Sequence, residues 1–274
     1  MNEQQIETIE IHLLLEAIYQ RYGYDFRCYA KASIKRRVNN FLKKSGFTRI
    51  SDLTMMLLRD ESFFEELLRN FAVSVTEMFR DPGFYQAIRK EIILYLETYP
   101  FIKIWHAGCA TGEEAYSLAI LLKEEGLYDR ATIFATDIYD DVLSNAREGI
   151  YSLEQMKKYT ENYQKAGGRR SFSDYYHARY DSAIMDKSLA KNITFAKHNL
   201  VTDSVFGEMH LILCRNVLIY FDTSLQEQVL RLFNDSLIHG GFLCLGSKES
   251  LRFTDVHLNF KQINERAKIY RKKS

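Results

Sequence analysis

The stretch that decides the fold is Ile104–Leu122, IWHAGCATGEEAYSLAILL, in which an apolar run breaks into a glycine turn and then into a helix. In a doubly wound α/β sheet the first such turn lies under a nucleotide-like ligand, because glycines let ligand atoms approach the backbone closely. A phosphate favours bare amides and cations at a helix N-terminus, whereas Glu113 and Glu114 lie in this first turn. The turn therefore predicts a cationic or hydroxyl-rich ligand rather than a di- or triphosphate.

Composition and charge limit the class of protein. The chain has 274 residues, of which 46% are hydrophobic and 27% charged, enough for one large domain or for a large domain with a small appendage. Because the formal net charge is only +1, electrostatic recognition has to be local. The sequence has no run of about 18 apolar residues, and its N-terminus has no signal-peptide core. We therefore expect a cytoplasmic protein without direct membrane insertion.

The cysteines and histidines indicate neither a disulfide framework nor a metal site. The four cysteines form no CxxC pair, and three of them lie in or beside apolar runs, where a reduced thiol packs as a small hydrophobe. The seven histidines show no ligand spacing, so no metal is expected.

Hydrophobic periodicity predicts a helical domain over residues 1–85. Apolar residues from Ile11 to Phe71 recur at helical spacing. One of these helices ends at Gly46 and carries a basic face made of Arg36, Arg37, Lys43 and Lys44. A run of charge is usually a solvated face, but it is also a surface on which an acidic partner docks.

The pattern over residues 86–274 alternates between strands and helices. We expect strands at 101–106, 132–136, 193–196, 210–214, 242–245 and 261–271, and helices at 113–125, 141–147 and 223–237, the last closed by Gly240-Gly241. Such alternation indicates an α/β, Rossmann-like fold, a largely parallel sheet covered by helices on both faces. The tyrosine-rich residues of about 151–192 do not fit it and predict an inserted subdomain or functional loop.

Polar residues follow two of the predicted strands. Asp137 ends the second strand, where an acid in a Rossmann-like fold accepts hydrogen bonds from a ribose diol; the alternative is a helix N-cap. Arg215 and Asn216 end a buried strand, at the edge where open α/β sheets bind ligands, although Arg215 is also suited to a salt bridge with a neighbouring helix. A further segment, Ser74–Pro82, is a weak signal on its own.

Taken together, these segments resemble the CheR-type chemotaxis receptor methyltransferases, which transfer a methyl group from S-adenosylmethionine to receptor glutamates. The resemblance extends from the N-terminal helices to about Leu251. It is most specific in Trp105–Ala119, in the CRNVLIYF of Cys214–Phe221 and in the GGFLCLGSKESL of Gly240–Leu251. It implies a helical N-terminal domain, a methyltransferase sheet that ends in an antiparallel strand, and a small inserted β-subdomain.

The resemblance also implies the site residues. With Gly108 of the turn, the cofactor-binding residues are Ser74, Thr76, Arg80, Gly108, Glu114, Asp137, Asn199, Leu200, Arg215 and Asn216. Glu114 suits the methionyl ammonium, Arg80 its carboxylate, and Asn199-Leu200 the adenine. Arg215 and Tyr220 are the expected catalytic residues: Arg215 holds the acceptor carboxylate, and Tyr220 orients it or lines the donor methyl. The expected product is S-adenosylhomocysteine, and the basic face would dock an acidic helical segment of a chemoreceptor.

Three departures from the family pattern are visible. Ser74 replaces the usual asparagine, Met78 lies where an aromatic is common, and His106 lies where serine is often found. The insertion also lacks the spaced glycines and arginine with which some members grip a receptor's C-terminal pentapeptide, so that kind of tethering is not expected.

Other functions are also compatible with the sequence. One is a methyltransferase that acts on another protein or on a small molecule, with the insertion deciding the acceptor. Another is a cofactor-binding sensor without turnover, which the serine at position 74 allows. A nucleic-acid substrate is not expected, because the net charge is near zero and no Asn-Pro-Pro-Tyr-like motif is present.

Overall fold

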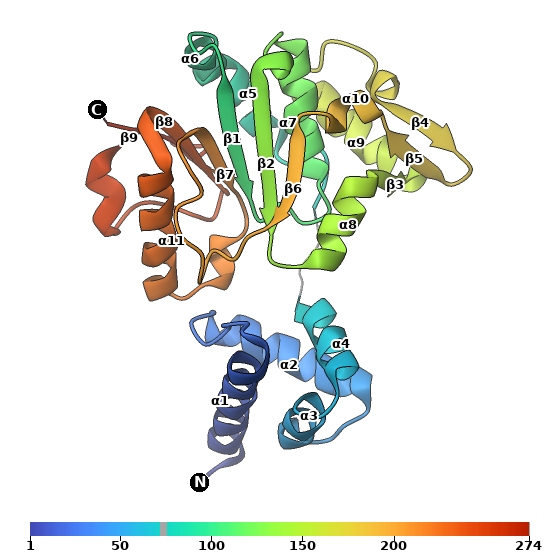
Figure 1. The fold of residues 1–274 in the computed structure, drawn as a ribbon, viewed down its shortest axis with the longest axis vertical. Helices are drawn as coiled ribbons and strands as arrows, with labels where there is room; N and C mark the ends of the chain where they lie inside the picture. Colours follow the sequence, from blue (N-terminus) through green and yellow to red (C-terminus); the bar gives the residue numbers. More distant parts are fainter. Residues whose placement is uncertain (72–75, 274) are drawn as a thin grey trace. The chain divides into compact units, whose positions relative to one another are not determined.

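The chain forms two compact units in a computed structural model that describes residues 1–71 and 76–273 (Figure 1). We call Met1–Val73 together with Ile219–Gln228 the helical unit, and Ser74–Leu218 together with Val229–Ser274 the sheet unit. The division after residue 73 differs from the expected boundary near residue 85. The boundary lies earlier because α5 (Pro82–Glu91) packs with the sheet unit: Phe84, Tyr85 and Ile88 are part of its hydrophobic core.

The helical unit is built from amphipathic helices, as the periodicity predicts. They are α1 (Glu3–Tyr22), α2 (Lys31–Ser45), α3 (Ile50–Leu57) and α4 (Glu61–Phe71). A segment from much later in the chain completes this unit. Phe221 pairs with Tyr29 in an antiparallel bridge, and the Ala30 N–H donates to the carbonyl of Tyr220.

The sheet unit contains a seven-stranded sheet of order β6-β2-β1-β7-β8-β10-β9. Its strands are β1 (Ile102–Ala107), β2 (Ala131–Asp137), β6 (Ile193–Lys197), β7 (Met209–Cys214), β8 (Leu237–Leu245), β9 (Phe260–Asn264) and β10 (Ile269–Lys272). The first five in this order are parallel, while β10 runs antiparallel to both β8 and β9. The expected α/β fold with a terminal antiparallel strand is therefore confirmed.

Helices cover both faces of this sheet. The chain moves from β1 to β2 and β6 in one direction and from β7 to β8 in the other. Because such crossovers are right-handed, α7 (Glu113–Glu124) and α8 (Asp140–Glu148) lie on one face and α11 (Thr223–Ser236) on the opposite face.

Two expectations about the end of the sheet are wrong. The region 261–271 is not one strand but the pair β9 and β10 joined by a short turn. Gly240-Gly241 do not close α11, because β8 begins directly after that helix and runs through both glycines. Gly240 has a φ of 76°, and the register between β7 and β8 shifts at this place, so the glycines permit a β-bulge.

The inserted residues form a small antiparallel sheet and the helices α9 and α10. Its strands are β3 (Ile150–Ser152), β5 (Ser182–Met185) and β4 (Tyr176–Arg179) in that order, with α9 (Leu153–Lys165) and α10 (Lys187–Ala190). The hydroxyls of Tyr163 and Tyr175 both donate to Glu124 at the end of α7. The tyrosines thus attach the insertion to the main sheet unit.

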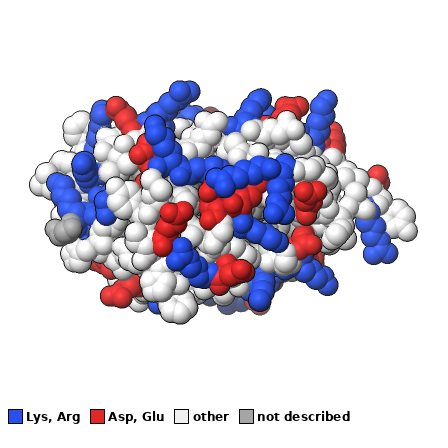
Figure 2. Space-filling model, turned by 90° about the horizontal axis from the view of Figure 1, so that it is seen from above, with Lys and Arg blue, Asp and Glu red and all other residues white. Residues whose placement is uncertain are grey.

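One face of the molecule is shown in Figure 2, where basic and acidic side chains are interspersed. This pattern agrees with the formal net charge of +1. Within the described residues, no helix combines the length and the apolar character needed to cross a bilayer.

Candidate active site

The carboxyl ends of the parallel strands bring the expected site residues to one edge of the sheet. His106 of β1 pairs in register with Leu213 of β7, and Ala107 pairs with Thr136 of β2. Asp137 directly follows Thr136, and Arg215 lies two residues after Leu213. This is the edge at which open α/β sheets bind their ligands.

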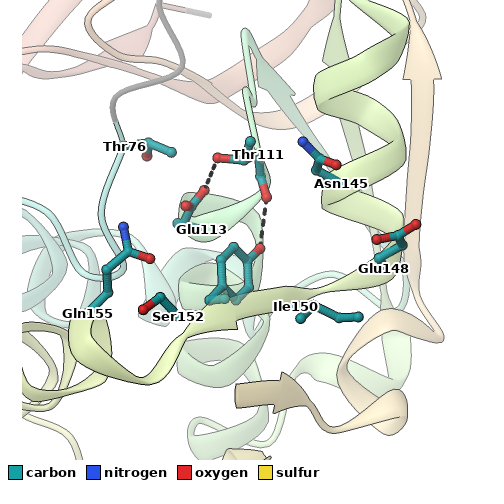
Figure 3. Close-up of a pocket in the computed structure, with 9 residues that line it drawn as sticks. Thr76, Thr111, Glu113, Asn145, Glu148, Ile150, Ser152 and Gln155 are labelled. Carbon is teal, nitrogen blue, oxygen red and sulfur yellow. Dashed lines mark hydrogen bonds between the residues drawn. The ribbon is translucent and has the colours of Figure 1, made fainter. Parts of the chain in front are cut away.

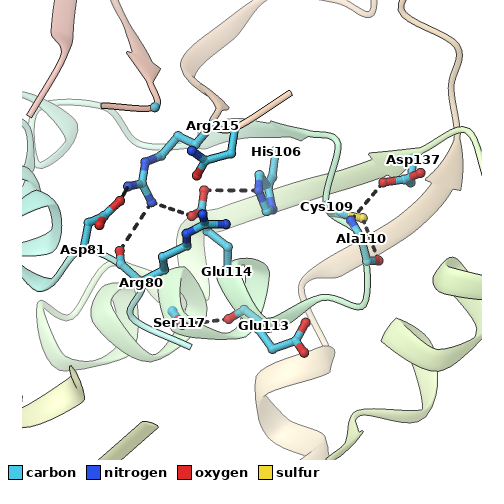
Figure 4. Close-up of polar contacts among 12 residues, drawn as sticks. Arg80, Asp81, His106, Cys109, Ala110, Glu113, Glu114, Ser117, Asp137 and Arg215 are labelled. Atoms are coloured by element: carbon cyan, nitrogen blue, oxygen red, sulfur yellow. Dashed lines mark hydrogen bonds and ion pairs between the residues drawn. The ribbon is translucent and has the colours of Figure 1, made fainter. Parts of the chain in front are cut away.

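Arg215 is the centre of a charged cluster (Figure 4). Its Nη1 donates to Glu114 Oε2 at 2.6 Å and its Nη2 to Asp81 Oδ2 at 2.7 Å. The guanidinium also lies 3.9 Å from the ring centroid of Phe84, and only 2% of the Arg215 side chain is exposed. Both ends of the guanidinium are therefore engaged with carboxylates of the protein itself.

Glu114 is a buried carboxylate that stays ionised. Burial raises its pKa, but the charge of Arg215 and the contact with His106 outweigh this effect and hold the pKa at about 2. His106 Nε2 lies 3.2 Å from Glu114 Oε1. The cluster thus keeps a fixed negative charge directly after the glycine turn.

Several buried polar atoms around this cluster have no hydrogen-bond partner. They are His106 Nδ1, Arg215 Nε and the hydroxyl of Tyr85. Most buried polar atoms in proteins are satisfied, so a group of unsatisfied ones marks a place shaped for something other than stability.

The backbone near the cluster adopts strained conformations. Positive φ angles occur at the non-glycine residues Phe79, Asp81, Ala110 and Asn216, with values of 52°, 57°, 47° and 63°. Such angles cost of order 1–3 kcal/mol each and gather at functional sites. The segment before α5 is held in place by the Phe79 N–H, which donates to Ser117 Oγ of α7.

Gly108 opens the glycine turn with a φ of 75°. A Cβ at this position would lie 2.4 Å from Val217 Cγ2, so no side chain fits there. The close approach that requires glycine is thus made by the segment after Arg215 and Asn216.

Asp137 is tied to the glycine turn. Its Oδ2 accepts the Ala110 N–H at 2.9 Å, and its Oδ1 accepts the N–H groups of Ile138 and Tyr139. Burial raises its pKa and these three backbone donors oppose the rise. The alternative role as N-cap of the next helix is wrong, since α8 begins at Asp140 with Tyr139 as its N-cap.

Asn199 and Leu200 lie just beyond β6, next to Asp137. The His198 N–H donates to the carbonyl of Asp137. Asn199 Oδ1 accepts the Val201 N–H at 3.0 Å, and its own N–H donates to Asp203. Leu200 is buried. The pair therefore forms a fixed turn beside the expected ribose acid.

A polar pocket of about 510 Å³ lies against the glycine turn (Figure 3). Thr76, Thr111 and Glu113 line it together with residues of α8, β3 and the start of α9. Thr111 Oγ1 donates to Glu113 Oε2, and the Tyr151 hydroxyl donates to the Thr111 carbonyl at 2.8 Å. Burial raises the pKa of Glu113. Thr76 is thus near the turn, while Ser74 lies outside the described residues.

Two residues of the site were missed from the sequence. Asp81 pairs with Arg215, and the buried Glu249 accepts the N–H groups of Asn216 and Gly246. Asp81 directly follows the expected Arg80, whose carbonyl lies 3.5 Å from Arg215 Nη1. Neither acid had a distinguishing sequence signal, because their partners are remote in the chain.

The expected docking face contains one error. Arg36, Lys43 and Lys44 are exposed, but Arg37 is buried and donates to the carbonyl of Phe71. Its guanidinium lies 4.7 Å from the ring centroid of Tyr220, within the helical unit. Arg37 therefore supports the interior of that unit and does not belong to the exposed basic surface.

A mainly parallel seven-stranded sheet, a glycine turn after β1 and an acid at the end of β2 define a nucleoside-cofactor enzyme of the methyltransferase class. Residues 74–269 match the family described as CheR methyltransferase, SAM binding domain, and residues 9–72 match its all-alpha domain. The chain belongs to the CheR methyltransferase family, and its cofactor is S-adenosylmethionine.

Curated relatives agree with this assignment. The Cher3 protein of Pseudomonas putida is 51% identical over 99% of this chain and 100% of its own length. The chemotaxis protein methyltransferase of Listeria innocua is 29% identical over 84% of this chain and 85% of its own. The enzyme of the same name from Escherichia coli is 28% identical, with coverage of 86% and 82%.

The residues at the sheet edge fit this cofactor. The ionised Glu114 suits a ligand that carries a sulfonium and an ammonium group. The carboxylate of Asp137 suits a ribose diol. The fixed negative charge beside the turn also disfavours a polyphosphate.

Proposed function

We propose that this protein methylates glutamate carboxylates of a chemoreceptor-like protein, forming methyl esters. Membership of the CheR family and the names of two relatives, chemotaxis protein methyltransferase, support this acceptor. The observation that carries the proposal is the buried Glu114–Arg215–Asp81 cluster at the carboxyl edge of the sheet. It provides a negative site for the cationic cofactor next to an arginine that can receive a carboxylate.

Each residue expected to hold the cofactor is assigned to the part of the cofactor that its charge or polarity fits. When bound, S-adenosylmethionine supplies an electrophilic methyl group on a sulfonium. Glu114 provides the anionic side of the pocket, while Thr76 and Arg80 hold the methionyl end. Asp137 binds the ribose diol, and the Asn199-Leu200 turn lies against the adenine. Gly108 and Asn216 shape the backbone around it.

The acceptor carboxylate needs alignment rather than activation. The ordinary pKa of a glutamate lies well below neutral pH, so it is already a nucleophile at pH 7 and no general base is required. The protein's tasks are then to position the carboxylate in line with the methyl carbon and to exclude water.

Arg215 can receive the acceptor only by exchanging a partner. Its contact with Glu114 is buried, whereas 51% of the Asp81 side chain is exposed. We therefore propose that the incoming carboxylate displaces the Asp81 carboxylate from Arg215 Nη2. Asp81→Asn should then lower the KM for the acceptor, because the competing anion is removed.

Tyr220 and the basic surface complete the proposal. Tyr220 is assigned to orient the acceptor, and Arg37 fixes the ring of Tyr220 within the helical unit.

The exposed Arg36, Lys43 and Lys44 are assigned to docking an acidic helical segment of the receptor. Reversing Arg36 to Glu should weaken acceptor capture and leave cofactor affinity unchanged.

The decisive experiment uses methyl-labelled S-adenosylmethionine and a purified cytoplasmic fragment of a chemoreceptor. Label that base releases as methanol indicates carboxyl methyl esters and supports the proposal. Base-stable label, or label only on another protein or a small molecule, contradicts the glutamate acceptor. Cofactor binding without any transfer identifies a sensor instead.

A further inference from the structure

The loop that follows β8 leaves the sheet at the site edge. Leu245, the last residue of β8, pairs in register with Cys214, which directly precedes Arg215. The chain then runs from residue 246 to residue 259 before β9 begins. This loop therefore starts beside the charged cluster.

The first turn of this loop is fixed to the site. The buried Glu249 accepts the Gly246 N–H and, at 3.1 Å, the N–H of Asn216. A Cβ at Gly246 would lie 2.8 Å from the backbone nitrogen of Asn216, so the two segments are in close contact. Movement at the base of the loop is thus restricted by the residue that follows Arg215.

The tip of the loop presents an aromatic side chain to solvent. Phe253 is 97% exposed and has a φ of 66°. The turn around it is held by Thr254, whose Oγ1 and N–H both bond to the carbonyl of Leu251. Leu251 and Val256 are buried on either side. A strained backbone that displays a large apolar group gains nothing for folding, which points to a role in binding.

The tip lies close in the chain to Glu249, which contacts the charged cluster through Asn216. Phe253 is four residues beyond Glu249, so an extended chain places it at most about 14 Å away. Lys248 and Arg252 are exposed on the same loop. Arg252 forms a 2.7 Å pair with Glu265, but both side chains are largely exposed, and such pairs contribute little. The loop thus combines an aromatic group with two cations.

We propose that residues 247–255 form an acceptor-docking loop. Phe253 packs against an apolar side chain of the acceptor next to the target glutamate, while Lys248 and Arg252 face acidic residues beside it. The inference rests on the proposed function, since a glutamate acceptor supplies the negative charge. Aromatic residues and arginine are enriched at protein-binding surfaces.

The test compares Phe253→Ala with a matched control. Tyr180→Ala is that control, because Tyr180 is also an exposed aromatic, at 88%, with a positive φ of 51°, but it lies on the turn between β4 and β5. The probe is a fluorescent cytoplasmic chemoreceptor fragment. Its Kd is measured by anisotropy with S-adenosylhomocysteine present, and its KM is measured in the methylation assay.

We expect Phe253→Ala to weaken fragment binding and to raise its KM about tenfold, as an interface anchor does. Phe253→Leu should recover most of this loss, and Tyr180→Ala should change neither value. The affinity for S-adenosylmethionine and the melting temperature should be the same in all variants. Replacing Lys248 and Arg252 by Glu should also weaken fragment binding, and this loss should be larger at low salt than at high salt.

The outcomes separate this inference from the proposed function. Equal fragment affinity in wild type and Phe253→Ala overturns the docking loop, even where methyl esters form normally. If Phe253→Ala loses affinity for the fragment and the wild type forms no methyl ester, the docking loop is supported and the proposed reaction is contradicted. Equal losses in Phe253→Ala and Tyr180→Ala also overturn the inference, because they show a nonspecific effect.

Discussion

The two faces of the glycine turn carry neighbouring glutamates whose pKa values are shifted in opposite directions. On one face, Glu114 is paired with Arg215 and has a pKa of about 2. On the other, Glu113 has the hydroxyls of Thr111 and Tyr159 beside it, and burial raises its pKa. Both side chains are buried to a similar degree. The partner, rather than the depth of burial, therefore decides the direction in which the pKa of each glutamate moves.

This difference suggests that the two faces have different functions. The charged face, with Glu114 and Arg215, keeps a permanent anion for a cationic cofactor and buries an arginine with it. The polar face, with its pocket and its hydrogen bond from Tyr151, supports the turn without a buried ion pair. Substitutions on the first face should therefore have much larger effects than substitutions on the second.

The largest effect is expected from Arg215→Met. It leaves Glu114 buried without its cation, and removal of one partner of a buried pair costs about 3–5 kcal/mol. Urea unfolding should show this loss, and methyl transfer should fall below detection. Arg231→Ala, which breaks an exposed pair with Asp255, should change stability by less than about 1 kcal/mol. Equal effects of the two variants would contradict the comparison.

Glu114→Gln should destabilise the protein in a pH-dependent way. The folded pKa of about 2 is below the ordinary 4.5, so ionised Glu114 stabilises the fold above pH 4.5. The shift corresponds to about 3 kcal/mol at neutral pH, and this contribution is lost as the pH falls toward 2. Unfolding free energies of wild type and variant should therefore converge on acidification. A constant difference between pH 7 and pH 3 would contradict the assigned pKa.

Tyr151→Phe should have a smaller effect on the other face. It removes one neutral hydrogen bond to the Thr111 carbonyl, which contributes about 1 kcal/mol. Because that carbonyl belongs to the glycine turn, we also expect a rise of a few-fold in the KM for S-adenosylmethionine. Calorimetric binding and thermal unfolding measure the two effects, and Tyr180→Phe on the exposed turn serves as the control.

Glu113→Gln should have the smallest effect. A raised folded pKa means that ionised Glu113 opposes folding above its ordinary pKa, so a neutral isostere should be as stable as wild type or more stable at pH 7. The change should stay within about 1 kcal/mol, since glutamine can still accept from Thr111. The advantage should disappear below pH 4.5, where the wild-type carboxyl is itself protonated. A clear loss of stability at pH 7 would show that Glu113 has a charged partner.

Much of the fold was predictable because it depends on local signals. Consecutive residues specify the strand at 101–106, the glycine turn and the helix that begins at Glu113, and the structure confirms these elements. The bulge at Gly240 was misread as a helix end, because a glycine pair gives the same signal in both settings.

The site was only partly predictable, since its pairings are remote in sequence. Arg215 meets Asp81 across more than a hundred residues, and no local pattern specifies that contact. Arg37 is different, because a signal was present. It lies three residues after Ile34 and four before Phe41, which places it on the buried side of its helix.

The return of residues 219–228 to the helical unit has a consequence for biosynthesis. The first helices emerge from the ribosome early, but Tyr29 forms its β-bridge with Phe221, which is translated much later. At a synthesis rate of about 5–20 residues per second, the unit waits roughly 10–30 s for its last element. During that interval the helical unit lacks residues 219–228, so we expect the N-terminal helices to become fully stable only after this segment has been synthesised.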